Sequence, residues 1–182
     1  MELAHNFLLA MPGLTGDYFA DSLTYICEHN EDGAMGLIVN RPSEVSLVEL
    51  FAQLGLASNH DLVDTPVMEG GPVALERGFV LHAGDRTFES SHQLADDLYL
   101  STAIDVLDAI AQSEGPENYL VTLGYAGWGA GQLEDEMGRN VWLSAPADTN
   151  VLFNTPFTER LNVAANTLGI DFSLIAGRPG HA

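Results

Sequence analysis

The clearest pattern of apolar and polar positions predicts a β-hairpin in the first third of the chain. Two apolar-rich runs, residues 23–29 (LTYICEH) and 34–40 (AMGLIVN), flank a loop over 30–33 (NEDG). An Asp-Gly pair between such runs favours a tight turn, because glycine readily adopts a positive φ. The second run is apolar on both faces, which is typical of a central strand covered on both sides. We expect this strand to end at 41–42 (RP), since proline has no N–H for strand pairing.

A helix is predicted shortly after the hairpin, from Ser46 to about Leu54. Ser46 and Glu49 have the spacing of a capping box, in which each side chain accepts a hydrogen bond from the other residue's backbone N–H. The apolar residues that follow have helical spacing, so one face of this helix is predicted to be buried. That face consists of Leu47, Leu50, Phe51 and Leu54.

Similar spacing predicts three further helices. The first covers 102–112 and ends before Gly115-Pro116. The second covers 131–137, with Gly138 as a left-handed stop. The third begins with Thr155 as its cap and Pro156 at its first position, and it ends at Gly169. The residues predicted to be buried on the first and third of these helices are Ile104, Leu107, Ala111, Leu161, Ala164, Ala165 and Leu168.

Strands and helices alternate in an order that predicts the fold class. Further strands are expected at 66–69, 78–82, 97–100, 119–125, 141–144 and 171–175. Hairpins occur beside strand–helix crossovers, which favours a mixed sheet over a purely parallel one. A chain of 182 residues with 46% apolar residues is large enough to bury a core. We therefore predict an α+β fold: a single domain over residues 1–182, with a large mixed β-sheet and flanking helices.

The charge of the chain excludes several classes of chemistry. All six basic residues are arginine, and they face 26 acidic residues, so the formal net charge is −20. Without lysine the chain has no Schiff-base lysine and no phosphate-binding P-loop lysine. Clustered positive charge is also needed to bind nucleic acid or anionic lipid. Nucleic acid is therefore an unfavoured partner, and no membrane association is predicted.

The absence of recognisable targeting signals and the single cysteine predict a cytoplasmic location. No apolar run approaches the 18 residues that a membrane-spanning helix needs. The N-terminal residues lack the positively charged start of a signal peptide. Cys27 is the single cysteine, which excludes an internal disulfide and fits a reducing compartment.

Three side chains are candidates for catalysis. On the strand over 23–29, Cys27 and His29 are two residues apart, so they share one face. A thiol beside an imidazole forms a reactive thiolate in some enzymes, and His82 ends another predicted strand. The favoured alternative is a buried cysteine beside a structural histidine. No H-E-x-x-H or C-x-x-C sequence supplies further ligands, so neither a metal site nor a cofactor is predicted.

The glycine-rich segment 124–131 (GYAGWGAG) is a candidate ligand site. It is predicted to link a strand to a helix, where backbone N–H groups could bind a phosphate. The spacing is G-x-G-x-G rather than G-x-G-x-x-G, which disfavours a dinucleotide site. The alternatives are a ligand cleft lined by Tyr125 and Trp128, or a tight turn in which Trp128 packs on glycine. Gln132 follows on the predicted helix, and after it Glu134 and Glu136 could act as acid and base, although an acidic pair on a helix is usually a solvated face.

Turns at strand ends carry the remaining candidates. Arg41 follows Asn40, and Arg77 follows the pair Gly70 and Gly71 by a few residues. An arginine at such a turn can hold an anionic ligand, but with so many carboxylates in the chain the favoured interpretation is local pairing with acidic groups.

Eight segments in this order resemble the AlgH/YqgE family of bacterial proteins. The matching segments are HNFLLAMP (5–12), YICEHNEDGAMGLIVNRP (25–42), GGPV (70–73), RGFVLH (77–82), STAIDVL (101–107), LGYAGWGAGQLEDE (123–136), NVWLSAPAD (140–148) and GHA (180–182). The resemblance covers nearly the whole chain. It implies a small cytoplasmic α+β domain with a large mixed sheet. It implies no established activity, although family members carry the label of transcriptional regulators.

Three functions follow from the sequence and the resemblance. The favoured function is a binding or regulatory domain that recognises a small molecule or a protein partner through a cleft at strand ends. The second is an enzyme, a hydrolase or a thiol-dependent activity, that uses Cys27 with His29 or His82. The third is a transcriptional regulator, for which direct DNA binding is disfavoured by the net charge of −20.

Overall fold

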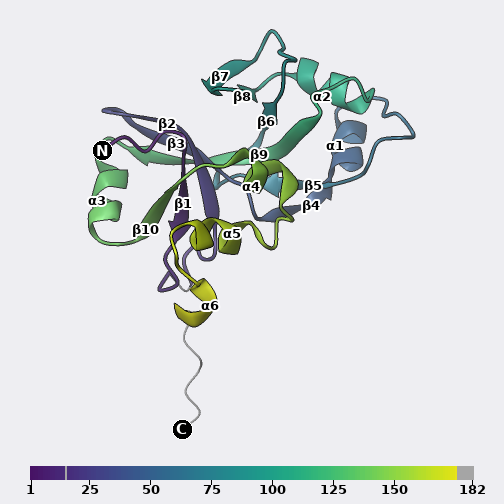
Figure 1. Ribbon diagram of the computed structural model, residues 1–182. Helices are drawn as coiled ribbons and strands as arrows, with labels where there is room; N and C mark the ends of the chain where they lie inside the picture. The colour runs from purple at the N-terminus through teal and green to yellow at the C-terminus, as the bar shows by residue number, and fades with distance from the viewer. Residues whose placement is uncertain (15, 176–182) are drawn as a thin grey trace. The chain divides into compact units, whose positions relative to one another are not determined.

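The computed structural model describes residues 1–14 and 16–175, and this part of the chain forms two compact units (Figure 1). The first unit consists of Met1–Asn40 and the chain from Gly127 onward, and the second consists of Arg41–Ala126. The GHA segment of the family resemblance lies outside the described residues. The expectation that residues 1–182 form one domain stays a prediction.

The first unit is built on four antiparallel strands in the order β10-β1-β2-β3. These strands are β1 (Asn6–Ala10), β2 (Leu23–Asn30), β3 (Gly33–Ile38) and β10 (Trp142–Pro146), and Figure 1 shows β1, β2 and β3 side by side. Asn30 pairs with Gly33 across a tight turn, as the Asp-Gly pattern predicts. β1 is absent from the sequence-based prediction.

A bulge in β2 changes the predicted alternation of side chains. The pairing of β2 with β3 shifts by one residue between Ile26 and Glu28, so Cys27 is the extra residue. Tyr25, Ile26 and Cys27 are all buried, whereas strict alternation would place Ile26 on the opposite face from the other two. The bulge therefore lies in the buried part of β2 and interrupts the alternation of side chains at Cys27.

The helices of the first unit differ in part from the prediction. They are α3 (Gln132–Gly138), α4 (Thr149–Asn154), α5 (Arg160–Thr167) and α6 (Phe172–Ile175). The helix predicted from Thr155 is wrong at its start, because α5 begins only at Arg160 and Thr155 is the C-cap of α4. Asp148 caps α4 instead, by accepting the N–H of Asn150 at 2.8 Å. The strand expected at 171–175 is helical.

Two further corrections concern the ends and faces of these helices. Gly138 lies inside α3, and Asn140 is the residue with a left-handed φ of 57°. On α5, Ala164 and Ala165 are buried as expected, but Leu168 is 36% exposed. The buried polar residue is Arg160, whose guanidinium donates to the carbonyls of Val39 and Thr155.

The second unit contains a mixed sheet with two helices. Its strands are β4 (Pro42–Ser46), β5 (Pro66–Glu69), β6 (Val73–Ala83), β7 (His92–Ala95), β8 (Leu98–Ser101) and most of β9 (Asn118–Gly129). β5 runs parallel to β9, whereas the β4–β5, β6–β9, β6–β8 and β7–β8 pairs are antiparallel. The predicted α+β class with a large mixed sheet and flanking helices is confirmed.

The two helices of the second unit, α1 (Leu47–Gln53) and α2 (Ile104–Ala111), pack into its core. Both arms of the predicted capping box form: Glu49 N–H donates to Ser46 Oγ at 3.2 Å, and Ser46 N–H donates to Glu49 Oε2 at 2.9 Å. Leu54 and Ile104 are 42% and 54% exposed, so the prediction that they are buried is wrong. Both residues lie at helix ends, where the chain leaves the core.

β9 is longer than predicted and passes from the second unit into the first. The glycine-rich segment is therefore mostly strand up to Gly129, rather than a turn after Tyr125. Gly131, with a φ of 74°, then serves as the cap of α3. Among the described residues, no helix has the length and apolar character needed to span a membrane.

Candidate functional site

A cleft of about 490 Å³ lies in the first unit between the end of β9, α3, the start of β10 and the segment around Phe19. Its volume falls in the range of small-molecule sites. We call it the aromatic cleft. Its lining residues are Leu14, Asp17, Tyr18, Phe19, Gly127, Trp128, Gln132, Glu136, Arg139, Val141 and Trp142. Both tryptophans of the chain are among them.

The carboxylate of Glu136 organises the walls of the aromatic cleft. Its Oε2 accepts the indole N–H of Trp142 at 2.7 Å and that of Trp128 at 3.0 Å. Its Oε1 accepts the amide of Gln132 at 3.0 Å. Gln132 in turn accepts the N–H of Gly129 at 3.0 Å. Two residues of α3, Gln132 and Glu136, thus position both indole side chains and the end of β9. All of the donors in these hydrogen bonds are uncharged.

The aromatic rings pack against one another at the base of the cleft. Phe19 stacks on Trp128 at a centroid distance of 6.1 Å and meets Trp142 edge-on at 5.5 Å. The two indoles are T-shaped at 6.0 Å. Trp128 and Trp142 are 6% and 3% exposed, while Tyr18 is 39% exposed and contacts Phe19 at 5.1 Å. The tryptophans therefore form a rigid floor, and the tyrosine lies nearer to solvent.

The lining of the aromatic cleft contains more acidic than basic side chains. Asp17 and Glu136 contribute carboxylates, and Arg139 contributes a guanidinium. Arg139 forms an ion pair with Asp135 at 2.8 Å, one helical turn away, and both side chains are largely exposed. Asp17 accepts the N–H of Phe19 at 2.9 Å, which holds the turn that presents the phenyl ring.

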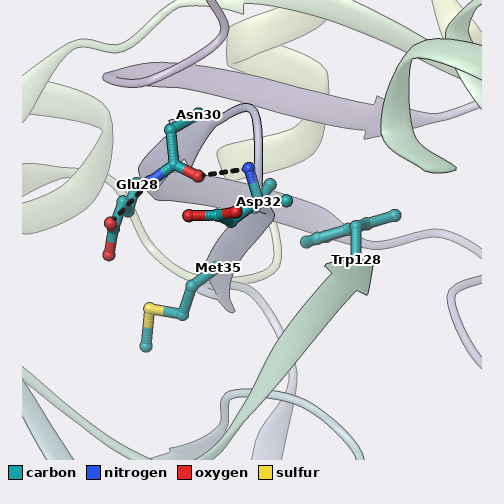
Figure 2. Close-up of a pocket in the computed structure, with 7 residues that line it drawn as sticks. Glu28, Asn30, Asp32, Met35 and Trp128 are labelled. Carbon is teal, nitrogen blue, oxygen red and sulfur yellow. Dashed lines mark hydrogen bonds between the residues drawn. The ribbon is translucent and has the colours of Figure 1, made fainter. Parts of the chain in front are cut away.

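A shallower pocket of about 270 Å³ lies at the tip of the β2–β3 hairpin. Figure 2 shows Asn30 between Glu28 and Asp32: its amide donates to Glu28 Oε1 at 2.9 Å, and its Oδ1 accepts the N–H of Asp32 at 2.8 Å. Trp128 lies on the other side of the turn. These polar groups stabilise the turn itself, so the hairpin pocket offers less for a ligand than the aromatic cleft.

His29 connects the N-terminal segment to α3. Its Nδ1 accepts the N–H of Leu3 at 3.1 Å, and its Nε2 lies 2.8 Å from Glu134 Oε1. A backbone N–H only donates, so Nδ1 carries no proton and Nε2 donates to the carboxylate. The backbone N–H of Glu134 and then His29 lower the pKa of the Glu134 carboxyl. His29 therefore acts as a neutral structural bridge in this arrangement.

Cys27 lies in an environment that suppresses thiol reactivity. Its side chain is buried in the first unit and 5% exposed. Burial, with the nearby Glu28 carboxylate as a second cause, raises the pKa of the Cys27 thiol well above its usual range. A thiol nucleophile reacts as the thiolate. The surroundings of Cys27 thus favour a structural role over the thiol-dependent activity considered from the sequence.

His82 lies in the second unit, at the centre of a small serine network. Its Nε2 is 2.8 Å from Ser101 Oγ, which is 2.9 Å from Ser91 Oγ. The imidazole is fully buried and stacks on Tyr99. Burial lowers the pKa of His82, and the Asp105 carboxylate opposes this effect. Its Nδ1 has no hydrogen-bond partner among the described residues. In a catalytic triad a carboxylate accepts a hydrogen bond from this nitrogen and orients the ring, and His82 has no such contact.

Three predicted ligand-binding residues help to hold or closely approach the backbone of neighbouring segments. Asn40 accepts the N–H of Leu23 at 2.8 Å and donates to the carbonyl of Asp21 at 2.9 Å. A Cβ on Gly70 would lie 2.3 Å from the carbonyl oxygen of Gly124. A Cβ on Gly71 would lie 2.0 Å from the Tyr125 carbonyl carbon. The two glycines are explained by close backbone approach.

The remaining candidates are spread over the second unit. Arg77 lies over the ring of Phe79 at 5.3 Å, and Tyr125 packs edge-on against the same ring at 5.8 Å. The backbone carbonyl of Arg41 accepts the N–H of Glu69 at 2.7 Å. None of these three residues lines the aromatic cleft or the hairpin pocket.

Of the residues singled out from the sequence, Trp128 and Gln132 line the aromatic cleft. Sequence reasoning missed Tyr18, Phe19 and Trp142 and treated Glu136 as part of a solvated face. The signal that could have found the site is the i, i+4 spacing of Gln132 and Glu136 between two tryptophans. In the described part of the chain, no group of three His, Cys, Asp or Glu side chains is arranged to hold a metal ion.

Comparisons with known proteins agree with this fold. A family described as AlgH-like matches residues 7–173. The UPF0301 protein of Nitrosospira multiformis is 47% identical over 183 residues, covering 100% of this chain and 98% of that protein. The solution structure of the AlgH protein from Pseudomonas aeruginosa has 47% identity and a TM-score of 0.78, and covers 99% of this chain and 96% of that one. A crystal structure from Corynebacterium diphtheriae, 18% identical with a TM-score of 0.76 over 98% and 93% of the two chains, shares the fold.

Proposed function

The chain belongs to the AlgH-like family, and from this premise we propose that it is a binding domain that recognises a small molecule in the aromatic cleft. The observation that carries the proposal is the arrangement of Glu136, which holds both tryptophans of the chain by their indole N–H groups. A cleft that combines aromatic walls with a few positioned polar groups is typical of ligand sites.

Binding is favoured over catalysis by the state of the titratable groups. Burial keeps the Cys27 thiol protonated, and the proton on His29 is committed to Glu134. The carboxylate of Glu136 accepts three hydrogen bonds from Trp128, Trp142 and Gln132, so it serves to position these side chains. These groups support recognition without a chemical step.

The contacts of α3 offer a route by which a bound ligand would have a regulatory effect. Gln132 and Glu136 face the aromatic cleft, while Glu134 on the same helix holds His29 and, through it, the backbone of Leu3. A ligand that contacts Gln132 or Glu136 would stabilise α3 and the N-terminal segment together. In the regulatory version of this function, a protein partner recognises the N-terminal segment once the ligand has stabilised it.

Direct binding of DNA is not part of the proposed function. The net charge of −20 repels phosphate, and the six arginines are distributed from position 41 to position 178 without a cluster. The proposed domain therefore acts through a small molecule or a protein partner.

The experiment that tests this function uses the tryptophans as reporters. Trp128 and Trp142 are the two tryptophans of the chain and both line the aromatic cleft, so a ligand bound there should change tryptophan emission. Trp128 also lines the hairpin pocket, so the effect of a Glu136 substitution is needed to assign the change to the aromatic cleft. We expect at least one compound in a metabolite library to change this emission saturably and to raise the Tm. Glu136→Gln should weaken that binding at least tenfold, because the amide cannot accept all three hydrogen bonds with a negative charge.

The matched control is Glu159→Gln, the same chemical change at an exposed position of the same unit. We expect this variant to bind within twofold of the unmodified protein. Circular dichroism and chemical denaturation establish that both variants are folded. A library without a single saturable compound, or hits that bind equally to Glu136→Gln, would contradict the proposed function.

A further inference from the structure

We propose that the aromatic cleft selects an organic cation, an ammonium group attached to an apolar or aromatic body. This inference rests on the proposed function, because it assigns a ligand class to the same site. Three observations support it: the negative charge of Glu136, the hydrogen bonds and ion pair that already engage the neighbouring donors, and the aromatic lining of the cleft.

The negative charge of Glu136 is oriented but not neutralised by its partners. The donors that reach it among the described residues are two indole N–H groups and one amide, all of them uncharged. A carboxylate offers about four acceptor positions, and these three bonds leave one on Oε1. An ammonium N–H at that position would complete the set and supply the missing opposite charge.

The groups that could recognise an anion are already engaged. The indole N–H of Trp128 and that of Trp142 both point to Glu136. Arg139 is the one basic residue in the lining, and its guanidinium is paired with Asp135 at 2.8 Å. Asp17 adds a second carboxylate. An anionic ligand would therefore meet two carboxylates and a single guanidinium whose charge is already shared with Asp135.

The aromatic lining suits the rest of such a ligand. Phe19 packs against both indoles and Tyr18 packs against Phe19, while Leu14 and Val141 add apolar surface to the lining. The faces of aromatic rings carry negative charge, so they attract ammonium groups and also accept an apolar body. The overall charge of −20 adds long-range attraction for cations.

The test compares three compounds with one phenyl body and different charge: 2-phenylethylammonium, 2-phenylethanol and 3-phenylpropanoate. Each is titrated into the full-length protein at pH 7, with tryptophan emission and calorimetry as readouts. We expect the ammonium to bind at least ten times more tightly than the alcohol and the carboxylate to show no saturable binding. Raising the salt concentration should weaken the ammonium and leave the alcohol unchanged.

Substitution of Glu136 tests the residue that the inference depends on. In Glu136→Gln we expect the preference for the ammonium over the alcohol to fall below threefold, while Glu159→Gln keeps it. Benzyltrimethylammonium, which has no N–H, separates the two contributions: it should bind more weakly than 2-phenylethylammonium but retain a preference over the alcohol through the rings.

The outcomes distinguish this inference from the proposed function. If the alcohol or the carboxylate binds as tightly as the ammonium, or if the library compounds that bind are neutral or anionic, the cation inference is overturned and the proposed function stands. If neither these compounds nor the library changes tryptophan emission, both are overturned. Cationic hits that lose affinity in Glu136→Gln support both.

Discussion

At the scale of single residues, burial decides what the chemically interesting side chains can do. Burial raises the pKa of the Cys27 thiol, and burial lowers the pKa of Arg160 to about 10. Arg160 nevertheless stays protonated at neutral pH and donates to two backbone carbonyls in the first unit. A cysteine that the sequence offers as a nucleophile is therefore a core residue. The buried Arg160 links α5 to the end of α4 at Thr155 and to Val39, which directly follows β3.

His82 should make the stability of the protein depend on pH. Burial lowers the pKa of the folded His82 below the value of about 6.5 that it has in the unfolded chain. Below that pH the unfolded state binds a proton that the folded state does not, so stability falls as the pH falls. We expect a loss of up to about 1.4 kcal/mol per pH unit from this group, the limit for one proton. Denaturant unfolding at pH 7, 6 and 5 measures it.

The variant His82→Gln separates this group from the many carboxylates. Glutamine places an amide near the position of Nε2, where it can still bond Ser101, but it does not titrate. We expect the variant to lose less stability than the unmodified protein between pH 6.5 and 5. Equal pH dependence in the two proteins would show that His82 is not responsible.

At the scale of elements, α3 is the helix that serves the candidate site. Its two carboxylates at positions 134 and 136 bind different partners: Glu134 contacts His29 on β2, and Glu136 contacts both indoles. Acidic residues on a predicted helix are usually solvated. These two have structural roles because β2 brings His29 to Glu134, while β9 and β10 bring Trp128 and Trp142 to Glu136.

The turn of the β2–β3 hairpin depends on Gly33. This residue has a φ of 137°, and a Cβ would lie 2.1 Å from the carbonyl oxygen of Trp128. We expect Gly33→Ala to lower the free energy of unfolding by at least about 2 kcal/mol, through backbone strain and the displaced Trp128. Urea unfolding followed by circular dichroism measures the change.

Gly138→Ala is the matched control in the same unit. Gly138 lies in α3, and a Cβ there would meet nothing within 4 Å. Alanine has the higher helix propensity, so we expect this variant to gain about 0.5–1 kcal/mol. If the two substitutions have the same effect, the close contact at Gly33 does not matter for stability.

Elements with local signals were predicted well, and elements defined by pairing were not. The hairpin around the Asp-Gly pair and the capped helix α1 are encoded within about ten residues each. β1, β4, β7 and α4 are absent from the sequence-based prediction. β1, for example, is a strand because β2 and β10 pair with its two edges, and β10 is more than 130 residues away in the chain. Local propensity carries little of that information.

At the scale of the whole molecule, the excess of carboxylates should destabilise the folded chain. With 26 acidic and six basic residues, like charges are closer together in the folded state than in the unfolded one. Added salt screens this repulsion over about 10 Å at 0.1 M. Between 20 and 500 mM NaCl we therefore expect a gain on the order of 1 kcal/mol, which is about 2–4 °C in Tm for a chain of this size.

The control for this prediction is a series of a neutral osmolyte whose osmolarity matches that of each NaCl solution. Calorimetry at pH 7 measures both series. A Tm that does not rise with NaCl, or that rises equally with the osmolyte, would contradict the electrostatic explanation.

The α+β class, the hairpin, the capped helix, the family and the strongly negative charge can all be predicted from the amino-acid sequence, because each depends on local patterns or on composition. The candidate site cannot be predicted in this way. Phe19, Trp128 and Trp142 come from three separate stretches of chain, and they share one cleft because strand pairing and α3 bring them together around Glu136. Tertiary burial likewise turned Cys27 from a possible nucleophile into a core residue. Both outcomes depend on contacts between residues far apart in the chain, which no local pattern records.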